Sequence, residues 1–393
     1  MSQPVNEMPA SRLPLFLILH VLLLSGGAGW ATVRYRSMEE AKIPPVPRLE
    51  PVAIRPLYDD PEAVSDDELQ RILVKLQPRL RGPSPKINHV DHALRMWGVP
   101  AAFDDEDCLS GVEMRELLLD HRRYSDHWGE ASPSLLVPTD DGVSVSVALG
   151  PQTSSHVDHT LATMAEIGTP LDYPVITSEG EVALHDLFQT TLKSFSLNQT
   201  EYEWSTLVFA IYMPHKAGWY SKGGQHITFD LLADRIMRQR LTQGVCRGNH
   251  RTFTLAMLLR IDDQISILSE KSRADVLAWL TDVTDRLVKS QRTEGFWDDQ
   301  WSGPEIEGTP PPPGANFTTA GMRLNVTGHV LEWWAMAPQE VLPPDDVRRR
   351  ATRWLIEEVD ELSPAEVRQY YTYLTHAGRA LAMWRGRFPH ECQ

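Results

Sequence analysis

Apolar residues recur at spacings of three and four along most of the chain from residue 64 onward. Such spacing places side chains on one face of an α-helix, because helical positions repeat roughly every 3.6 residues. Leu69, Ile72, Leu73 and Leu76 form the first such face. The pattern predicts twelve helices in a mostly helical domain. They lie at about residues 69–76, 88–98, 109–124, 155–167, 182–195, 200–213, 228–240, 250–261, 273–290, 327–336, 345–359 and 364–385.

Helix-start signals support several of these boundaries. Ser65 precedes the first helix, and acidic residues follow it in the first helical turn. Thr200 and Glu203 have the spacing of a capping box, in which two side chains bond reciprocally to backbone N–H groups. Ser363 and Glu366 repeat that spacing at the start of the last helix. These signals favour helices that begin where the apolar spacing begins.

Two stretches depart from the helical spacing. In residues 134–150 an Asp-Asp-Gly turn comes before an alternating Val-Ser-Val-Ser-Val run, a pattern typical of a β-hairpin. Residues 302–318 are rich in proline and glycine and contain no helical pattern. We therefore expect one short hairpin, and a loop between the ninth and tenth helices.

The N-terminal part differs from the rest in having no polar face. Residues 13–33 form an uncharged run of 21 residues, just long enough to cross a bilayer as a helix. The run predicts a transmembrane anchor at 12–33 behind a tail at 1–11, and a cleaved secretory signal is the alternative. A linker at 34–63, with five prolines between 43 and 56, then leads into a domain at 64–393. The signal-like shape favours a single-pass protein whose helical domain lies outside the cytoplasm.

A histidine motif repeats along the helices. His89-Val-Asp-His92 is echoed by His156-Val-Asp-His159, and looser versions surround His250, His329 and His376. In the order of the predicted helices these fall on the second, fourth, eighth, tenth and twelfth, while the sixth has Glu203 and Trp204 at the same place. All are even-numbered helices. We interpret the repeat as positional, with each histidine near a helix start.

The even numbering of these helices has a spatial consequence. In a stack of antiparallel helical hairpins every second helix runs the same way, so the starts of the even helices gather on one rim. Free N–H groups there carry partial positive charge, which favours anions and keeps a nearby imidazole neutral. The alternative is that these histidines are ordinary helix caps.

One motif carries a family resemblance. Gln291-Arg-Thr-Glu294-Gly295-Phe-Trp297 resembles the repeat that closes helical hairpins in the terpenoid cyclase and protein prenyltransferase group. The resemblance implies an (α/α)6 toroid of about twelve helices. Its physical basis is a tight turn at the glycine and a tryptophan that fills the space between neighbouring hairpins.

The chemistry of that group transfers less directly. The Asp-x-Asp-Asp signature of the cyclases is absent, and Asp104, Asp105 and Asp107 fit a solvated acidic loop better. The prenyltransferases hold zinc through Asp, Cys and His. In this sequence Cys246 and His250 could supply two ligands, and no third ligand is identifiable. We therefore predict no cofactor and leave zinc as an alternative.

Composition excludes some classes of partner. The formal net charge of −15 argues against nucleic acid, whose binding depends on neutralising phosphates. Three widely spaced cysteines, Cys108, Cys246 and Cys392, do not make a disulfide scaffold. A small-molecule, lipid or glycan ligand and a membrane contact through the N-terminal segment are the partners that we expect.

The functional expectation is a membrane-anchored α/α toroid with a histidine-lined pocket that binds or processes a cell-envelope glycan or an isoprenoid lipid. The alternative is a non-catalytic interaction scaffold in the envelope. If it is an enzyme, a neutral histidine is the base, Glu203 or Tyr371 its acid partner, and Arg251 stabilises charge. The candidate catalytic residues are His250, His329, His376, Glu203, Arg251 and Tyr371, and the candidate binding residues are His89, His156, Trp219, Trp301 and Trp333.

Overall fold

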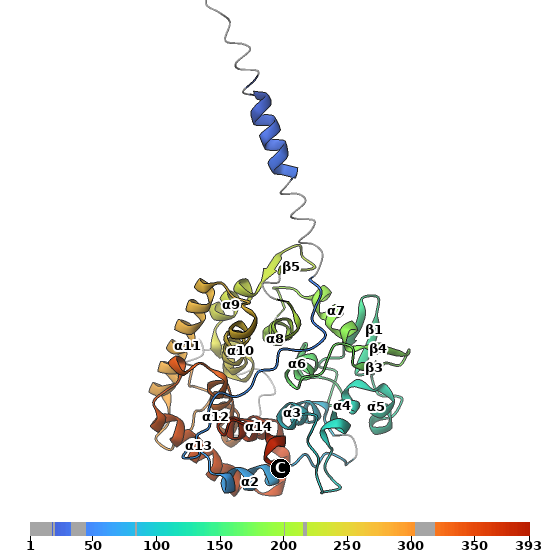
Figure 1. Cartoon of the computed structure of the whole chain (residues 1–393). Coiled ribbons are helices and arrows are strands. Elements are labelled where there is room, and N and C mark those ends of the chain that lie inside the picture. Colours follow the sequence, from blue (N-terminus) through green and yellow to red (C-terminus); the bar gives the residue numbers. More distant parts are fainter. Residues whose placement is uncertain are drawn as a thin grey trace, which may run out of the picture.

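The computed structural model describes residues 18, 20–32, 45–82, 85–199, 201–214, 218–302 and 319–393, and in these the chain is mostly helical (Figure 1). Its main helices are α2 (Asp66–Lys75), α3 (Ile87–Trp97), α4 (Gly111–Leu119), α5 (His121–Trp128), α6 (His159–Glu166), α7 (Leu184–Ser194), α8 (Glu203–Tyr212), α9 (Phe229–Arg238), α10 (Asn249–Ile265), α11 (Glu270–Ser290), α12 (Thr319–Met336), α13 (Asp345–Glu361) and α14 (Pro364–Met383). The all-α class predicted from the spacing is confirmed.

Each of the twelve predicted helices corresponds to an observed one, with two differences. The third is divided into α4 and α5, because Asp120 adopts an extended backbone and its carboxylate accepts the Arg122 N–H as an N-cap. The tenth, α12, already begins at Thr319 rather than near residue 327, so His329 lies well inside it. The capping boxes at Ser65 and Ser363 are present. Thr200 lies outside the described residues, and α8 begins at Glu203 with no side-chain cap.

Three small hairpins accompany the helices in the described part of the chain. The predicted one is confirmed as β1 (Leu136–Thr139) paired with β2 (Gly142–Val145). Two more, β3 (Pro174–Ile176) with β4 (Glu181–Ala183) and β5 (Gly218–Tyr220) with β6 (His226–Thr228), are antiparallel pairs of three residues each. Strands of three residues are too short to show alternation, which is why the pattern missed them.

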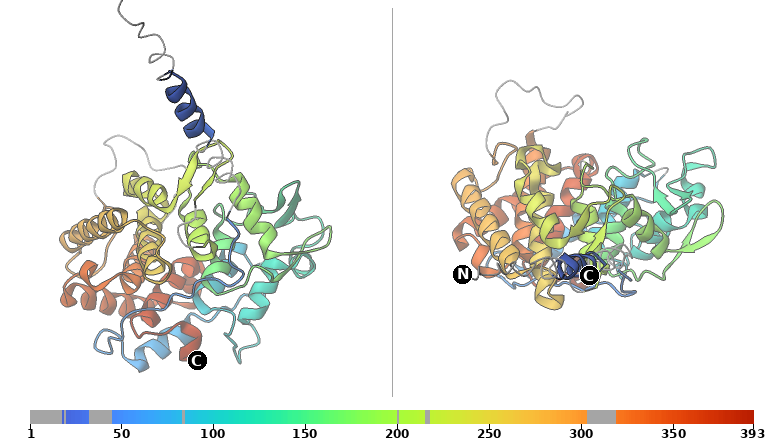
Figure 2. Two further views of the ribbon diagram at one scale, coloured as in Figure 1. Left: turned by 45° about the horizontal axis from the view of Figure 1, so that its top comes forward. Right: turned by 90° about the horizontal axis from the view of Figure 1, so that it is seen from above.

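Six helices contact one another in a closed cycle. Helix α3 packs on α6, α6 on α8, α8 on α10, α10 on α12, α12 on α14, and α14 again on α3. Helices α2, α4, α7, α9, α11 and α13 each contact members of this cycle, and Figure 1 shows α2, α11 and α13 at the periphery. Seen from above, in Figure 2, the helices form one layer of roughly uniform height. We call the six helices of the cycle the inner ring.

Helix α11 ends in the motif that carried the resemblance. Gly295 has a φ of +110°, and a Cβ there would lie 2.5 Å from the Arg350 carbonyl oxygen, so only glycine fits. The Gln291 side chain donates to the carbonyls of Gly295 and Val347, both at 2.8 Å. Trp297 is fully buried, and its indole N–H donates to the Leu287 carbonyl at 2.8 Å. The predicted turn and tryptophan plug are therefore present.

The N-terminal part has two distinct described pieces. Residues 20–32 form a helix whose apolar side chains are exposed, and the remainder of the predicted span lies outside the described residues. Within the described part of the chain, no helix combines the length and apolarity needed to cross a bilayer. Downstream, the proline-rich segment lies against the helices: the N–H groups of Arg48 and Val52 donate to the Tyr212 and Ile211 carbonyls. Residues 45–63 thus pack onto the domain and are not a free spacer.

Candidate functional site

Six histidines meet inside the inner ring. Neighbouring imidazole centroids lie 4.6 Å apart for His92 and His159, 6.0 Å for His159 and His156, 6.4 Å for His156 and His250, 4.7 Å for His250 and His329, 3.6 Å for His329 and His376, and 5.3 Å for His376 and His92. All except His156 are at most 4% exposed. We call this set the histidine layer.

The close contact of His329 and His376 has a local cause. At Gly328, beside His329, a Cβ would lie 3.0 Å from the Ala377 N atom, so the missing side chain lets α12 approach α14. The expected position at helix starts holds for His250, the second residue of α10, but is wrong for His329 and His376, which lie inside α12 and α14. The histidines gather because the helices run in parallel and in register, not because they begin there.

A charged layer lies one helical turn further along the same helices. Arg95, Glu332 and Arg379 each follow a histidine of the first layer by three positions, and Glu166 ends α6. Arg95 bonds to Glu166 and Glu332 at 2.8 Å each, and Arg379 bonds to the same two carboxylates. All four side chains are at most 5% exposed. The four charges cancel, which makes their burial tolerable.

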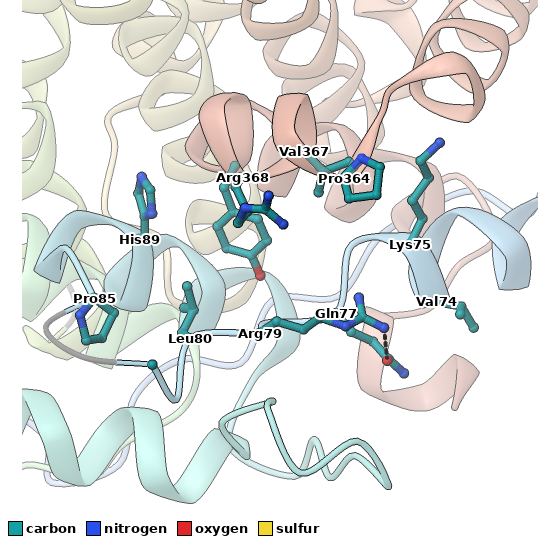
Figure 3. Close-up of a pocket in the computed structure, with 12 residues that line it drawn as sticks. Val74, Lys75, Gln77, Arg79, Leu80, Pro85, His89, Pro364, Val367 and Arg368 are labelled. Carbon is teal, nitrogen blue, oxygen red and sulfur yellow. Dashed lines mark hydrogen bonds between the residues drawn. The ribbon is translucent and has the colours of Figure 1, made fainter.

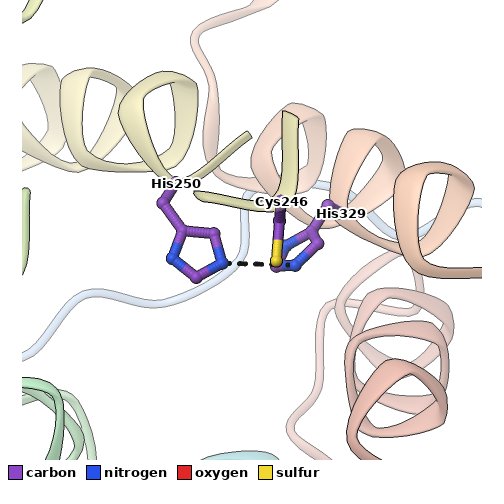
Figure 4. Close-up of side chains that lie close together, drawn as sticks. All are labelled: Cys246, His250 and His329. Carbon is purple, nitrogen blue, oxygen red and sulfur yellow. Dashed lines mark hydrogen bonds between the residues drawn. The ribbon is translucent and has the colours of Figure 1, made fainter. Parts of the chain in front are cut away.

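Two histidines of the histidine layer and a cysteine beside them form a group suited to a metal ion. The ligand atoms of Cys246, His250 and His329 all lie within 4.8 Å of one another (Figure 4). The thiol reaches this position through an unusual turn before α10, where Cys246 and Arg247 both have left-handed backbone angles, with φ of 48° and 58°. Left-handed angles at two successive non-glycine residues are costly, and such strain gathers at functional sites. The Asn249 amide donates to the Cys246 carbonyl at 2.9 Å and supports the turn.

Electrostatics favours a thiolate in this group. Burial alone would raise the pKa of the Cys246 thiol, but the adjacent His329 holds that pKa below its usual value. Burial likewise opposes the charge on His329, yet Cys246 and Glu332 raise its pKa to about 9. The thiol and the imidazole thus each favour the charged form of the other, and a metal ion bound by both would take the place of their protons.

A second group, His329, Glu332 and His376, also has ligand-like spacing. The oxygens of Glu332 are already engaged: one accepts from Arg95 and Arg379, and the other lies 2.8 Å from His376 Nδ1 and 3.4 Å from His329 Nδ1. A cation beside two guanidinium groups would be repelled. Glu332 is better suited to orient His329, whose Nε2 lies 3.3 Å from His250 Nε2.

An aspartate and histidine pair lies on the other side of the layer. His159 Nδ1 is 3.0 Å from Asp91 Oδ2, which also accepts the Thr160 hydroxyl at 2.7 Å. In a neutral imidazole this bond would place the proton on Nδ1 and leave Nε2 as an acceptor. Nε2 is buried without a hydrogen-bond partner among the described residues. Trp204 separates His159 from His250, with centroids 4.5 Å from each. His159 is thus an imidazole base held ready by a carboxylate.

The other predicted catalytic residues lie outside this layer. Glu203 Oε1 and Arg251 Nε pair at 2.7 Å, both buried, and join α8 to α10. Tyr371 donates to the Leu76 carbonyl at 3.2 Å and lies near His89, with centroids 5.9 Å apart. Tyr371 and His89 both line a separate pocket.

The predicted tryptophans are core residues, and His156 is the member of the layer nearest solvent. Trp219 packs against Phe209, with ring centroids 5.1 Å apart, and Trp333 against Trp334 at 5.6 Å. Trp301 is only 4% exposed. His156 pairs with Glu201 at 2.8 Å, and both side chains are about one quarter exposed, at 24% and 26%.

Sequence reasoning did not place several residues of this region among the candidate site residues: His92, His159, Asp91, Arg95, Glu166, Glu332 and Arg379. A signal for most of them exists in the chain, since a histidine is followed three positions later by a histidine or a charged residue at His89, His156, His329 and His376, and again at His92. Three positions are close to one helical turn, so the two residues of each pair lie on the same face of the chain.

No protein-family model, curated protein or solved structure matches this chain. The resemblance drawn from residues 291–297 therefore has no independent support, and the function must be argued from the geometry of the layers.

Proposed function

We propose that the inner ring and the helices around it form an α/α toroid whose centre binds one zinc ion through Cys246, His250 and His329. The observation that carries the proposal is the convergence of these three ligand atoms within 4.8 Å. His329 supplies the third ligand for which the chain offered no sequence signal. One sulfur and two imidazole nitrogens are a donor set that suits zinc better than magnesium or calcium, which prefer oxygen.

The surroundings favour a catalytic over a structural ion. Three protein ligands leave one position of a tetrahedral zinc free, as in catalytic sites. Bound zinc would polarise a substrate oxygen or lower the pKa of a water molecule. Glu332 would orient His329, and His159, held by Asp91, would take up a proton from the substrate or from water.

We propose accordingly a metal-dependent enzyme of the hydrolytic or group-transfer type. Its substrate belongs to the class expected from the sequence, a cell-envelope glycan or an isoprenoid lipid, and the N-terminal segment would hold the domain at a membrane. A scaffold would have no need of histidines from five helices at one centre. His250, His329 and His376 share one buried layer, which argues for a common site.

Metal analysis of the purified full-length protein tests the proposal. We expect about one equivalent of zinc, its loss in Cys246→Ser and His329→Asn, and its retention in the matched controls Cys392→Ser, in the last 3-10 turn, and His226→Ala, on β6. Cobalt substitution should give a thiolate charge-transfer absorption that disappears in Cys246→Ser. Protein that folds and holds no stoichiometric metal, or a Cys246→Ser variant with normal metal content, would overturn it.

A further inference from the structure

A cavity of about 600 Å³ lies outside the histidine layer (Figure 3). It is bounded by the end of α2, the segment after α2, and the first turns of α3 and α14. None of the residues proposed above to bind zinc lines it. Its volume is within the range of small-molecule sites.

One wall of this pocket is apolar. Leu80, Pro85, Pro364 and Val367 contribute aliphatic surface from the chain around α2, α3 and α14. Tyr371 adds an aromatic ring, and because its hydroxyl donates to the Leu76 carbonyl the ring side remains for contact. A wall of this kind suits a hydrocarbon body.

The mouth of the pocket is basic. Lys75, Arg79 and Arg368 line it, and among its described lining residues there is no aspartate or glutamate. This is unusual for a chain with a net charge of −15. The Lys75 ammonium donates to the Asp360 carbonyl and Arg79 pairs with Asp105 at 2.8 Å. Arg368 is exposed, and the structure gives it no hydrogen bond or ion pair with a described residue.

Two neighbouring features bear on the charge of the pocket. The first turn of α3 has no side-chain cap, although its Ile87 and His89 N–H groups donate to the Pro151 and Lys86 carbonyls. His89, on the same turn, stays neutral at pH 7, because burial and the nearby Lys86 lower its pKa to about 4. It therefore adds no charge to the pocket.

We propose that this pocket binds a single-chain amphiphilic anion, with the hydrocarbon chain against Leu80, Val367 and Tyr371 and the carboxylate or phosphate head at Arg368. Arg368, which pairs with none of the described residues, is the group that this ligand would neutralise. The proposal is independent of the zinc site.

Displacement of a fluorescent fatty acid from the full-length protein tests this assignment. Dodecanoate and dodecyl phosphate should compete, and dodecanol, which lacks the charge, should bind at least ten-fold more weakly. The exchange Arg368→Gln should weaken dodecanoate binding about ten-fold, since it removes a charge-assisted hydrogen bond. The matched control Arg286→Gln, an exposed arginine on α11, should leave binding unchanged.

Two further arms separate the other outcomes. Sedimentation with anionic phospholipid vesicles detects a membrane-surface role: Arg368-dependent vesicle binding without dodecanoate binding would overturn the single-chain ligand. Equal binding of dodecanol and dodecanoate, or an Arg368→Gln variant that binds normally, would also overturn it. Cys246→Ser should bind dodecanoate normally, so failure of the zinc site and failure of this pocket are distinguishable.

Discussion

The centre of the inner ring and the Trp297 side chain at the exit of α11 are both buried, yet their polar atoms differ in hydrogen bonding. At the exit the Trp297 N–H groups and the Gln291 amide all have acceptors, on Leu287, Thr327, Gly295 and Val347. At the centre His159 Nε2, His250 Nδ1 and Asp91 Oδ1 have none among the described residues. The exit is built like a stable core, and the centre is not.

This difference has an energetic meaning. A buried polar atom without a partner costs about 1–3 kcal/mol relative to a bonded one, so a centre with several such atoms opposes folding. Natural proteins retain unmet polar atoms where a ligand or a reaction satisfies them. We therefore expect the exit to control stability, and the centre to control what is bound.

Trp297→Ala should have the largest effect on stability. Truncating a fully buried tryptophan costs about 4 kcal/mol, and here the indole hydrogen bond to Leu287 is lost as well. Denaturant unfolding followed by circular dichroism measures the loss, while zinc per folded molecule should stay the same. A loss below about 1 kcal/mol, or folded protein without metal, would break the contrast between the two regions.

Glu332→Gln tests the centre itself. Removing the carboxylate charge leaves Arg95 and Arg379 sharing only Glu166, which should cost about 3 kcal/mol because those cations stay buried. The change also removes the carboxylate beside His329, so zinc affinity should fall about 10-fold or more. Chelator competition measures the affinity. Glu357→Gln, at an exposed position of α13, is the control and should alter neither quantity.

The elements of the fold were largely predictable, because they are encoded locally. Helical spacing located every main helix of the domain, and the order of the helices placed His156, His250, His329 and His376 together. The division at Asp120 was not predictable, since one residue that leaves the helical backbone does not interrupt the apolar spacing.

The site was less predictable, because it depends on helix rotation and long-range closure. In His156-Val-Asp-His159 both histidines can face the ring, and the packing of α6 against α3 decides that His159 meets Asp91. His329, the third residue of the proposed zinc site, lies on α12. This helix contacts α10 only once the ring is folded. The pocket beside Arg368 joins two stretches that lie far apart in the sequence, residues 74–89 and 364–371, and neither stretch alone carries its pattern.

The smallest stability effect that we predict is at the cap of α2, where a polar side chain at the surface has its hydrogen-bond partners. Glu68 completes the capping box with Ser65 and pairs with Arg353. Burial opposes its charge, but the bonds from Ser65 and Arg353 outweigh that effect and lower the pKa of Glu68 to about 2.

Because this pKa lies below the unfolded value of about 4.5, the stabilisation is present above pH 4.5 and disappears as the pH falls toward 2. Glu68→Gln should therefore cost about 1 kcal/mol at pH 7 and almost nothing near pH 2. Urea unfolding at several pH values measures the difference, with the exposed neighbour Asp67→Asn as the control. If the cost of Glu68→Gln were the same at both ends of this range, the carboxylate would not be the group that caps α2. The predicted order of stability effects, from the α11 exit through the ring centre to the α2 cap, would then lose its smallest member.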